Sequence, residues 1–540
     1  MATYNYSPHQ HIKIWLSNTP HRFMNLENQV RLIKMREQNP DDIIHLVYDS
    51  TLLTPVAQND LTVFCKENNI IPVDADKLPT RLISKNERIL FKFYKDEICH
   101  LSEGGNLAVA SDILRWISPI YQLGSYSDFD YPVDTSILPK FIKVQSPLLL
   151  NIGTLKIGQK EFILANNDYI AVVDATAAKA DIERVQQGII SRLTQYSTDF
   201  IEKTEQELQQ GSLLNNYLIK LMKNRAEVFY ISHSNTLGAQ PNSSRNIRKY
   251  VHETMSDKNT FLNFNRQSPE ENDASVIHRL RAKLQKELNL IKYLFFSKEY
   301  AEMKSILQQN DDAFIVYLMK TELELYLKSI VVCTTGPLEI SRALFNGYVL
   351  DTKKIVDIVH PLSFNYYNLQ KAFQSPNSIP LHENILGMLR FMGVDKGVVD
   401  DSSWLESGRV LQEGRAHKLE EQQQELASNL ASSLLEIKEH MFIQLQRVSQ
   451  KSNKIFFKRR QETYKAALQE ILSCFHHEKN EFDVAQFKSI LVASPMQHAD
   501  AFSSLFFKDI QEQIKHLEKI SYNAVVFRLT ENKKIKLNYH

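Results

Sequence analysis

The first third of the chain alternates short apolar runs, which suit β-strands, with segments whose apolar residues recur at helical spacing. These β-like runs and the helical patterns between them occupy residues 12–16, 24–38, 43–48, 56–68 and 70–73. Strands that alternate with helices fold into a mainly parallel sheet with helices packed on it. Residues 12–175 are therefore expected to form an α/β fold.

A predicted helix at about residues 103–122 leads into a pair of acids. Its sequence, EGGNLAVASDILRWISPIYQ, carries apolar residues at helical spacing, so we expect it to pack on the sheet. Gly124 and then SYSDFD follow, which we expect to be a strand that ends at the carboxylates Asp128 and Asp130, with Phe129 between them. Ligands of open α/β sheets bind at the carboxyl ends of the strands, where this order places both acids. Because paired carboxylates repel each other, the pair is either solvated or faces a cation.

The predicted helix before the acid pair adds a third acid, Asp112, and a guanidinium, Arg115. In the segment SDILRW, Asp112 and Arg115 are three residues apart and share one helix face. Two acids for a divalent cation, one further acid for hydroxyl groups and a guanidinium for phosphate suit a nucleotide diphosphate with a metal. An isolated D-x-D pair is more often a solvated loop, and an isolated Asp–Arg pair is more often a surface ion pair, so the prediction rests on their combination.

Composition excludes some classes of protein. A chain of 540 residues exceeds the size at which one core keeps growing, so two or three domains are expected. The 64 Lys and Arg residues balance 63 Asp and Glu residues, which argues against a nucleic-acid binder held by bulk charge. The cysteines lack a CxxC pair and are predicted to be buried thiols; they are Cys65, Cys99, Cys333 and Cys474.

Changes of pattern along the chain predict four segments. Residues 178–329 are mostly helical in pattern, and the β-like IVVCTT at 330–335 follows them, so they look inserted into the α/β region. From about residue 409 the pattern is helical again, with an apolar face that needs a partner surface. The predicted domains are 1–177 and 330–408 for the two parts of the core, 178–329 for a helical insertion and 409–540 for a helical C-terminal domain.

The segment NLAVASDILRWISPIYQLGSYSDFD resembles the DxD core of GT-A glycosyltransferases, in particular the glucosylating domain of the large clostridial toxins and related bacterial effector glycosyltransferases. Further segments resemble that family in the same order: KIWLSNTP at 13–20, LVYDS at 46–50, ANNDYIAV at 165–172, TTGP at 334–337 and SSWLESGR at 402–409. The resemblance covers roughly residues 12–175 and 330–408. It implies a Rossmann-like GT-A core with large helical insertions and a helical C-terminal region.

The resemblance assigns a nucleotide pocket to matching residues. It implies that Trp15 stacks on uracil, with Ile14 beside it and Leu107 lining the same pocket. It also implies that Tyr126 and Asp128 contact ribose or the water shell of a metal. Judged alone, Trp15 would be read as a core aromatic, because aromatic side chains mostly serve burial.

The resemblance also assigns the metal and the sugar. It implies that Asp130 ligates Mn²⁺ or Mg²⁺, with Asp128 and Ser402 as further metal contacts. Asp112 and Arg115 would hold the hydroxyl groups of the donor sugar and the diphosphate. From the late turn and a closing lid, Gly336 and Trp404 would approach the sugar nucleotide.

Two positions depart from the toxin pattern. Asp400 and Asp401 stand where the toxins have a Glu before the serine of the lid. Cys333 stands where the toxins have an Asn near the sugar, which leaves the choice between UDP-glucose and UDP-N-acetylglucosamine open. Retention of the anomeric configuration is implied only by the resemblance, because the sequence identifies no nucleophile.

The expected function is metal-dependent transfer of a hexose from a UDP-sugar to a protein acceptor, such as a host GTPase, by a bacterial effector. One alternative is a transferase that builds a bacterial glycan or glycolipid, and another is an inactive GT-A scaffold whose helical domain binds a partner. The chain shows no signal peptide and no apolar run of about 18 residues, so it is expected in a cytosol, that of the host if it is secreted.

The C-terminal region holds two further motifs. The basic, aromatic KSNKIFFKRR at 451–460 suits peripheral contact with an anionic membrane, with a solvated helix face as the alternative. CFHHEKNE at 474–481 invites a zinc interpretation, but adjacent histidines point to different sides of a helix.

Overall fold

The computed structural model of the protein describes most of the first 345 residues and short stretches beyond them. The described residues are 3–130, 133–136, 138–144, 146–157, 160–194, 243–291, 301, 304–345, 350–351, 409–422, 425, 439, 443, 466, 469, 472–473, 475–476, 481–483, 526–529 and 535–537. The chain forms two compact units, the first of Met1–Phe23 with Met35–Arg409 and the second of Met24–Lys34 with Val410–His540.

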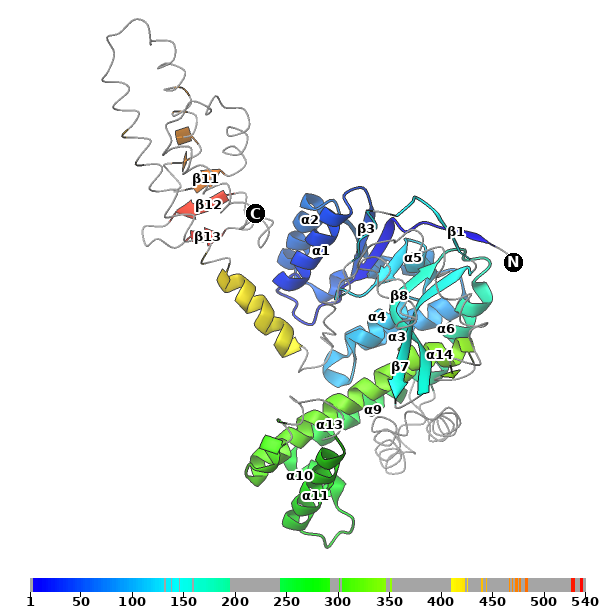
Figure 1. The fold of residues 1–540 in the computed structure, drawn as a ribbon, viewed down its shortest axis with the longest axis vertical. Helices are drawn as coiled ribbons and strands as arrows, with labels where there is room; N and C mark the ends of the chain where they lie inside the picture. The colour runs from blue at the N-terminus through cyan, green and yellow to red at the C-terminus, as the bar shows by residue number, and fades with distance from the viewer. Residues whose placement is uncertain are drawn as a thin grey trace, which may run out of the picture. The chain divides into compact units, whose positions relative to one another are not determined.

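A mixed seven-stranded sheet lies at the centre of the first unit (Figure 1). Its strands are β2 (Gln10–Ile14), β3 (Ile43–Tyr48), β4 (Ile71–Asp74), β5 (Ser125–Ser127), β7 (Leu148–Ile157), β8 (Lys160–Val172) and β9 (Leu350–Asp351). The strand order is β4-β3-β2-β5-β8-β7, with β9 also paired to β8. The pairs formed among β2, β3, β4 and β5 are parallel, and those that involve β8 are antiparallel. The α/β fold predicted from the sequence is confirmed.

The helices of this region begin where the sequence supplies N-caps. They include α2 (Pro55–Glu67) and α3 (Lys85–Cys99), whereas α1 (Leu26–Gln38) begins in the second unit. The Thr54 side chain accepts from the Ala57 N–H at the start of α2, and Ser84 with Glu87 forms a capping box at the start of α3. The sequence analysis placed α1 and α2 correctly but named no helix at α3.

The helix predicted at 103–122 is broken into two. These are α4 (Leu107–Leu114) and α5 (Ser118–Tyr121), and a short 3₁₀ turn, η4 (Leu101–Glu103), precedes them. Pro119 has no N–H to bond the carbonyl four residues earlier, so one continuous helix cannot run through it. The Asn106 side chain accepts from the N–H groups of Ala108 and Val109 and thereby sets the start of α4.

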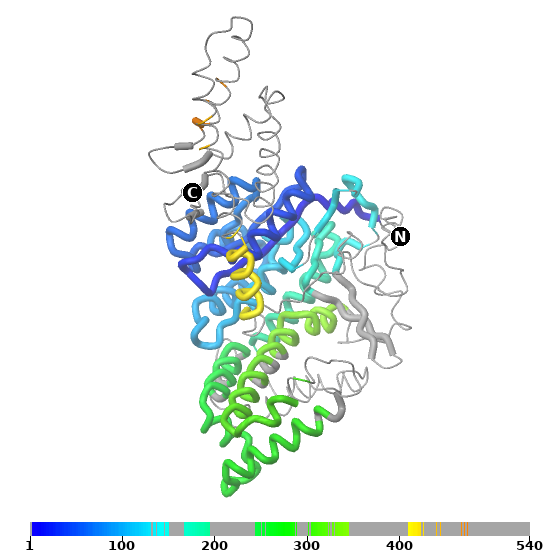
Figure 2. Tube along the Cα trace, turned by 60° about the vertical axis from the view of Figure 1, so that its left-hand side comes forward, coloured from blue at the N-terminus to red at the C-terminus, as the bar shows by residue number. Residues whose placement is uncertain are grey.

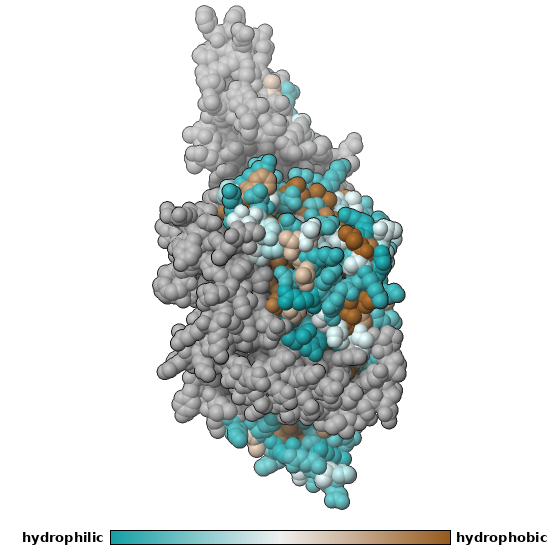
Figure 3. Space-filling view, turned by 90° about the vertical axis from the view of Figure 1, so that its right-hand side faces the viewer, coloured by the Kyte–Doolittle hydropathy of each residue, from teal (hydrophilic) through white to brown (hydrophobic). Residues whose placement is uncertain are grey.

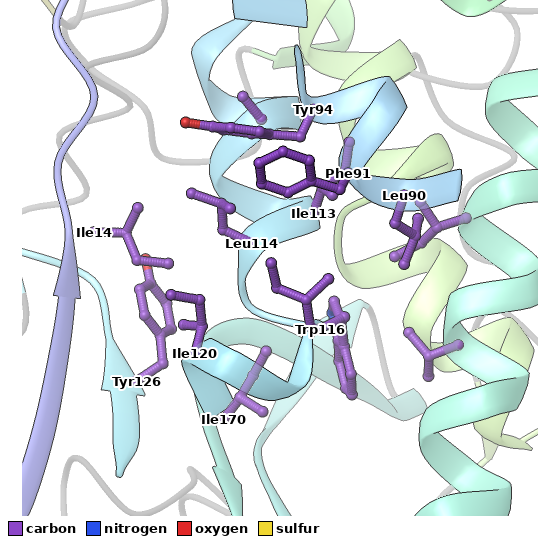
Figure 4. Packing of buried hydrophobic residues seen from close by; sticks show 14 of the residues in the cluster. Ile14, Leu90, Phe91, Tyr94, Ile113, Leu114, Trp116, Ile120, Tyr126 and Ile170 are labelled. Carbon is purple, nitrogen blue, oxygen red and sulfur yellow. The ribbon is translucent and has the colours of Figure 1, made fainter. Parts of the chain in front are cut away.

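The main core lies where α3 and α4 pack against the sheet, as predicted for α4. Figure 4 shows side chains from α3, α4, α5 and three strands meeting there. The labelled members are Ile14, Leu90, Phe91, Tyr94, Ile113, Leu114, Trp116, Ile120, Tyr126 and Ile170. Trp116 is completely buried among them. Burial of this much apolar surface fixes α4 on the sheet.

A helical segment follows the sheet region in the sequence. Its described helices are α6 (Lys179–Thr194), α9 (Ser243–Ser256), α10 (Lys258–Asn265), α11 (Asp273–Ile291), α13 (Asp311–Thr334) and α14 (Pro337–Phe345). In Figure 2, α9 and α13 lie side by side, and both contribute to a second hydrophobic core. This core includes Val251, Phe314 and Cys333.

The strand predicted at 330–335 is wrong. Residues 330–334 continue α13, which Asn310 caps by accepting from the Ala313 N–H. The β-branched residues of IVVCTT suggested a strand, but a short apolar run does not distinguish a buried strand from a buried helix. Ile330 and Cys333 face the second core at helical spacing, and their burial outweighs local strand propensity.

Small sheets complete the description. In the first unit, β1 (Tyr4–Tyr6) pairs with β6 (Ile142–Val144). In the second unit, residues 410–422 are helical, and the antiparallel strands β10 (Phe475–His476), β11 (Glu481–Asp483), β12 (Val526–Leu529) and β13 (Ile535–Leu537) form a sheet. The sequence analysis did not anticipate these four strands, because runs of two to four residues are too short to show a period.

Burial of the cysteines differs in part from expectation. Cys65 and Cys333 are buried thiols as predicted, but Cys99 is exposed at the last residue of α3, and Cys474 lies outside the described residues. Among the helices that the structure describes, none is long and apolar enough to cross a membrane. The face in Figure 3 shows mostly hydrophilic side chains between small, separate apolar patches where its residues are described.

Gly124, the residue before β5, allows a test of whether the close approach of β5 to β2 requires a glycine. It has φ +145°, and an added Cβ would lie 2.5 Å from the Gln10 backbone oxygen. We expect Gly124→Ala to lower the free energy of unfolding by about 1–3 kcal/mol. The φ angle is strained for alanine, and the atom that its Cβ would meet belongs to the backbone, which cannot move aside as a side chain can. Urea denaturation measures the change.

Gly414→Ala is the matched control. Gly414 lies within the helical residues 409–422, and an added Cβ would meet nothing within 4 Å. This variant should be stabilised by up to about 1 kcal/mol, as alanine favours a helix. Equal effects of the two substitutions would contradict the steric explanation.

Candidate functional site

The acid pair lies at the carboxyl end of β5, as predicted. Asp128 directly follows β5, and its N–H donates to the Asp168 backbone oxygen at 2.9 Å. The neighbouring parallel strand β2 ends at Ile14, so Trp15 lies at the same edge of the sheet. Asp128 and Asp130 are half-buried, whereas Asp112 and Arg115 from α4 are 4% and 7% exposed.

Arg115 connects the predicted site residues. Its NH1 lies 3.1 Å from Asp112 Oδ1 and donates to the Asn167 backbone oxygen at 2.7 Å. Its NH2 donates to Asp128 Oδ1 at 3.1 Å, and its Cζ stacks 4.2 Å from the centre of the Tyr126 ring. Burial disfavours the charge of Arg115, but the acidic groups of its neighbours raise its pKa above the ordinary value. Arg115 is therefore a permanent cation between two acids.

Asp112 is held by donors from distant parts of the chain. Its Oδ1 accepts from Asn167 Nδ2 at 2.7 Å, and its Oδ2 accepts from Thr335 Oγ1 at 2.7 Å. Burial raises the pKa of Asp112 to about 7, although Arg115 and the two donors favour its charged form. Asp112 thus titrates near neutrality.

Tyr126 on β5 and Lys13 on β2 contact the acidic turn, which we define as Asp128–Asp130. The Tyr126 hydroxyl donates to Asp128 Oδ1, and burial raises the pKa of this hydroxyl far above its ordinary value. Lys13 on β2 is 2% exposed; its Nζ donates to the Asp128 backbone oxygen at 2.6 Å and lies 5.9 Å from the centre of the Phe129 ring. Sequence analysis missed Lys13, although a lysine inside the β-like run IKIWL was a usable signal.

The residues that follow the acids are fixed to the sheet. Asn39 Nδ2 donates to the Val133 backbone oxygen at 2.7 Å, and the Thr135 N–H donates to Asn39 Oδ1 at 2.6 Å. The Thr135 hydroxyl also contacts Asp42. Burial raises the pKa of Asp42, but hydrogen bonds from His11 and Thr135 outweigh it and lower that pKa to about 2. The acidic turn is therefore held at both ends.

The other predicted nucleotide contacts occupy different environments. Trp15 is half-buried. Its backbone N–H donates to the Val47 backbone oxygen at 2.9 Å, and its ring meets the Phe23 ring edge-on with centroids 5.4 Å apart. Ile14 is 6% exposed and belongs to the main core. Leu107 is half-buried at the first position of α4 and packs on that core.

The late turn reaches the site through a residue that sequence analysis did not select. Thr335 contacts Asp112, and Gly336 follows it with its N–H donating to the Val331 oxygen at 2.9 Å. Cys333 does not take the sugar-side position assigned to it, because it is 1% exposed in the second core. Ser402 and Trp404, with Asp400 and Asp401, lie outside the described residues.

The chemistry of the acid pair fits a hard divalent cation. Among the described residues, both hydrogen bonds to the Asp128 carboxylate reach Oδ1, so Oδ2 is the oxygen that could ligate a metal together with Asp130. No group of three or more His, Cys, Asp or Glu side chains that could hold a metal occurs within the described part of the chain. The two aspartates would need further oxygen ligands from the substrate, water or other residues.

A parallel-rich sheet carries Asp128 at the carboxyl end of β5, beside Arg115 and Asp112 of α4. The model of glycosyltransferase family 88 matches residues 1–363. The chain therefore belongs to glycosyltransferase family 88, and the predicted class, a glycosyltransferase with an α/β core and helical regions, is confirmed.

Other comparisons give less. No curated protein matches the chain. Among solved structures, the chain is similar to the PaToxG glycosyltransferase, with 14% sequence identity over 60% of this chain and 87% of that chain and a TM-score of 0.26.

The raised pKa of Asp112 predicts a pH-dependent stability. Because the folded state binds this proton more tightly than the unfolded state, the contribution of Asp112 is most favourable below pH 3.8 and is lost as the pH rises to about 7. Relative to Asp112→Asn, the wild-type protein should lose stability on the order of 4 kcal/mol between these limits. Urea denaturation of both proteins between pH 5 and 8 measures most of this change, and a difference that does not vary with pH would contradict it.

Proposed function

We propose that the protein transfers a hexose from a UDP-sugar, either UDP-glucose or UDP-N-acetylglucosamine, to a protein acceptor in a metal-dependent reaction. The observation that carries this proposal is the convergence of Asp112, Arg115 and Asp128 beside Asp130 at the carboxyl edge of the sheet. Membership of a glycosyltransferase family supports it. The donor sugar, the metal and the acceptor are parts of the proposal.

Charge explains how these residues would act. Cleavage of the bond between the sugar and UDP leaves negative charge on the diphosphate. A divalent cation bound by Asp128 and Asp130 would neutralise that charge as a Lewis acid. Arg115 would bind the diphosphate oxygens, and its pairing with Asp112 and Asp128 keeps the guanidinium oriented before the substrate arrives. Asp112 would accept hydrogen bonds from sugar hydroxyl groups.

The acceptor belongs to the same proposal. We place the protein among bacterial effectors that modify a host protein, such as a GTPase, after secretion into the host cytosol, with retention of the anomeric configuration. The resemblance of the DxD segment to toxin glycosyltransferases supports this assignment. Peripheral membrane contact through residues 451–460 would bring the enzyme to a membrane-bound acceptor, and these residues lie outside the described part of the structure.

Asp130→Asn tests the metal site. Proton NMR of the protein with Mn²⁺ and each UDP-sugar measures donor hydrolysis and the anomer released. Loss of an electrostatic stabiliser should lower the rate about 10²–10³-fold without loss of folding, and EDTA should abolish the wild-type rate.

Asp134→Asn is the matched control, because within the described part of the chain Asp134 bonds in a local turn, where its Oδ1 accepts from the Ser136 N–H at 3.0 Å and from the Ser136 hydroxyl at 2.6 Å. It should retain the wild-type rate. An Asp130→Asn protein as active as the wild type would remove the metal-site assignment. If the wild type hydrolyses neither UDP-sugar and does not bind UDP, the result would favour an inactive scaffold.

Arg115→Lys tests the diphosphate contact. Lysine keeps the charge but loses the planar fork, so the affinity for UDP with Mn²⁺ should fall about 10- to 100-fold. Isothermal titration calorimetry measures it. Arg184→Lys changes an exposed arginine of α6 in the same way and should bind UDP like the wild type; equal affinities of all three proteins would exclude Arg115 as the phosphate ligand.

A further inference from the structure

The start of α4 is anchored by a buried carboxylate from α3. Glu97 is completely buried, and its Oε2 accepts from the backbone N–H of Asn106 at 2.9 Å. Asn106 is the residue that caps α4, so the position of Glu97 fixes the first turn of that helix. The same helix carries Asp112 and Arg115.

The helical segment supplies the counter-charge for this carboxylate. Arg248 on α9 is 1% exposed, and its NH2 donates to both oxygens of Glu97. Its Nε donates to the Gly104 backbone oxygen at 2.8 Å, and its NH1 donates to Ser244 Oγ at 2.9 Å. Each nitrogen of the guanidinium is engaged, so the fork has a single orientation.

The buried Glu97–Arg248 pair fixes the relative position of α3 and α9 more than it stabilises the fold. Burial of two charges costs desolvation free energy that their attraction only offsets, so two apolar side chains could hold α9 and α3 together as well. A planar guanidinium on a planar carboxylate instead fixes distance and angle. Here that fixed geometry passes from Glu97 to Asn106 and to the start of α4.

The length of α4 allows this constraint to reach the site. The helix spans Leu107–Leu114, and Asp112 and Arg115 lie at its far end. A second residue of the helical segment, Thr335, holds Asp112 directly. Because a short helix moves as one body, displacement of its first turn shifts both charged side chains relative to Asp128.

We propose that Glu97 and Arg248 are positioning residues for the sugar transfer, through which the helical segment sets α4 and hence Arg115 and Asp112. This inference rests on the proposed function. Neither residue touches the reacting groups: they act through Asn106 and the backbone of α4.

The main test is the double variant Glu97→Gln/Arg248→Met, which leaves no unpaired charge buried and preserves an acceptor oxygen for Asn106. The kcat of UDP-sugar hydrolysis should fall at least about 10-fold at a temperature well below the melting temperature, with KM within about threefold of the wild type. Arg248→Lys keeps the positive charge but loses the planar guanidinium, and its kcat should lie between that of the wild type and that of the double variant. An unchanged kcat in the double variant would overturn the proposal.

The control removes a neighbouring ion pair that joins the same two helices. Arg245 Nε on α9 lies 2.8 Å from Asp96 Oδ2 on α3, and Arg245 NH1 donates to the Glu103 backbone oxygen at 3.2 Å, whereas the bond to the Asn106 N–H comes from Glu97. Asp96→Asn/Arg245→Met should therefore keep the wild-type kcat. An equal loss in this control would show general loosening of the helices and would also overturn the proposal.

Hydrogen–deuterium exchange separates this inference from the proposed function. Peptides that cover residues 105–116 should exchange at least about 10-fold faster in the Glu97→Gln/Arg248→Met variant than in the wild type or the control, while α3 should remain protected. Unchanged exchange would refute the positioning role whether or not the wild type turns over a UDP-sugar. A wild type without turnover contradicts the proposed function alone.

Discussion

The guanidinium of Arg115 is a permanent charge inside the protein, and the local structure depends on how it is satisfied. A buried charge without partners is strongly unfavourable, so the elements around it must supply acceptors. Asp112 comes from α4, Asp128 from the end of β5, and the Asn167 backbone oxygen from β8. Because one cation joins these three elements, displacement of any of them leaves Arg115 or an acid unsatisfied. The site and the fold therefore share one constraint.

The helical segment takes part in this constraint. Thr335, 223 residues from Asp112 in the sequence, supplies one of the donors to that carboxylate, and Arg248 reaches the start of α4 through Glu97. These contacts make the helices α9 and α13 part of the structure that orders the charged residues. Arg248 belongs to the segment 178–329 that the sequence predicts as an insertion, whereas Thr335 belongs to the predicted second part of the core, so both parts of the chain help to order the charged residues.

Sequence reasoning found what local pattern determines. The alternation of strand and helix gave β2, β3 and β4, and the order of strand and acids located Asp128 at a carboxyl end. Thr335 could not be found in this way, because its contact with Asp112 has no periodic signal. Cys333 was placed near the sugar by the resemblance to the toxins, and IVVCTT was interpreted as a strand; residues 330–334 instead continue α13, so that Cys333 lies in the second core while Thr335, which follows the helix, contacts Asp112. Lys13 was within reach, since an apolar strand rarely carries a buried cation.

The balance of charge determines how the proposed ligands would bind. The charged side chains around this turn are Arg115 and Lys13 against Asp112, Asp128, Asp130 and Asp168, which leaves about two net negative charges when Asp112 is ionised and about one when it is protonated. A diphosphate alone would be repelled by the acid pair, and a divalent cation alone would be repelled by Arg115. Together their charges largely cancel, and each then meets the protein group of opposite sign. In the proposed reaction, the cation and the UDP-sugar therefore favour each other's binding.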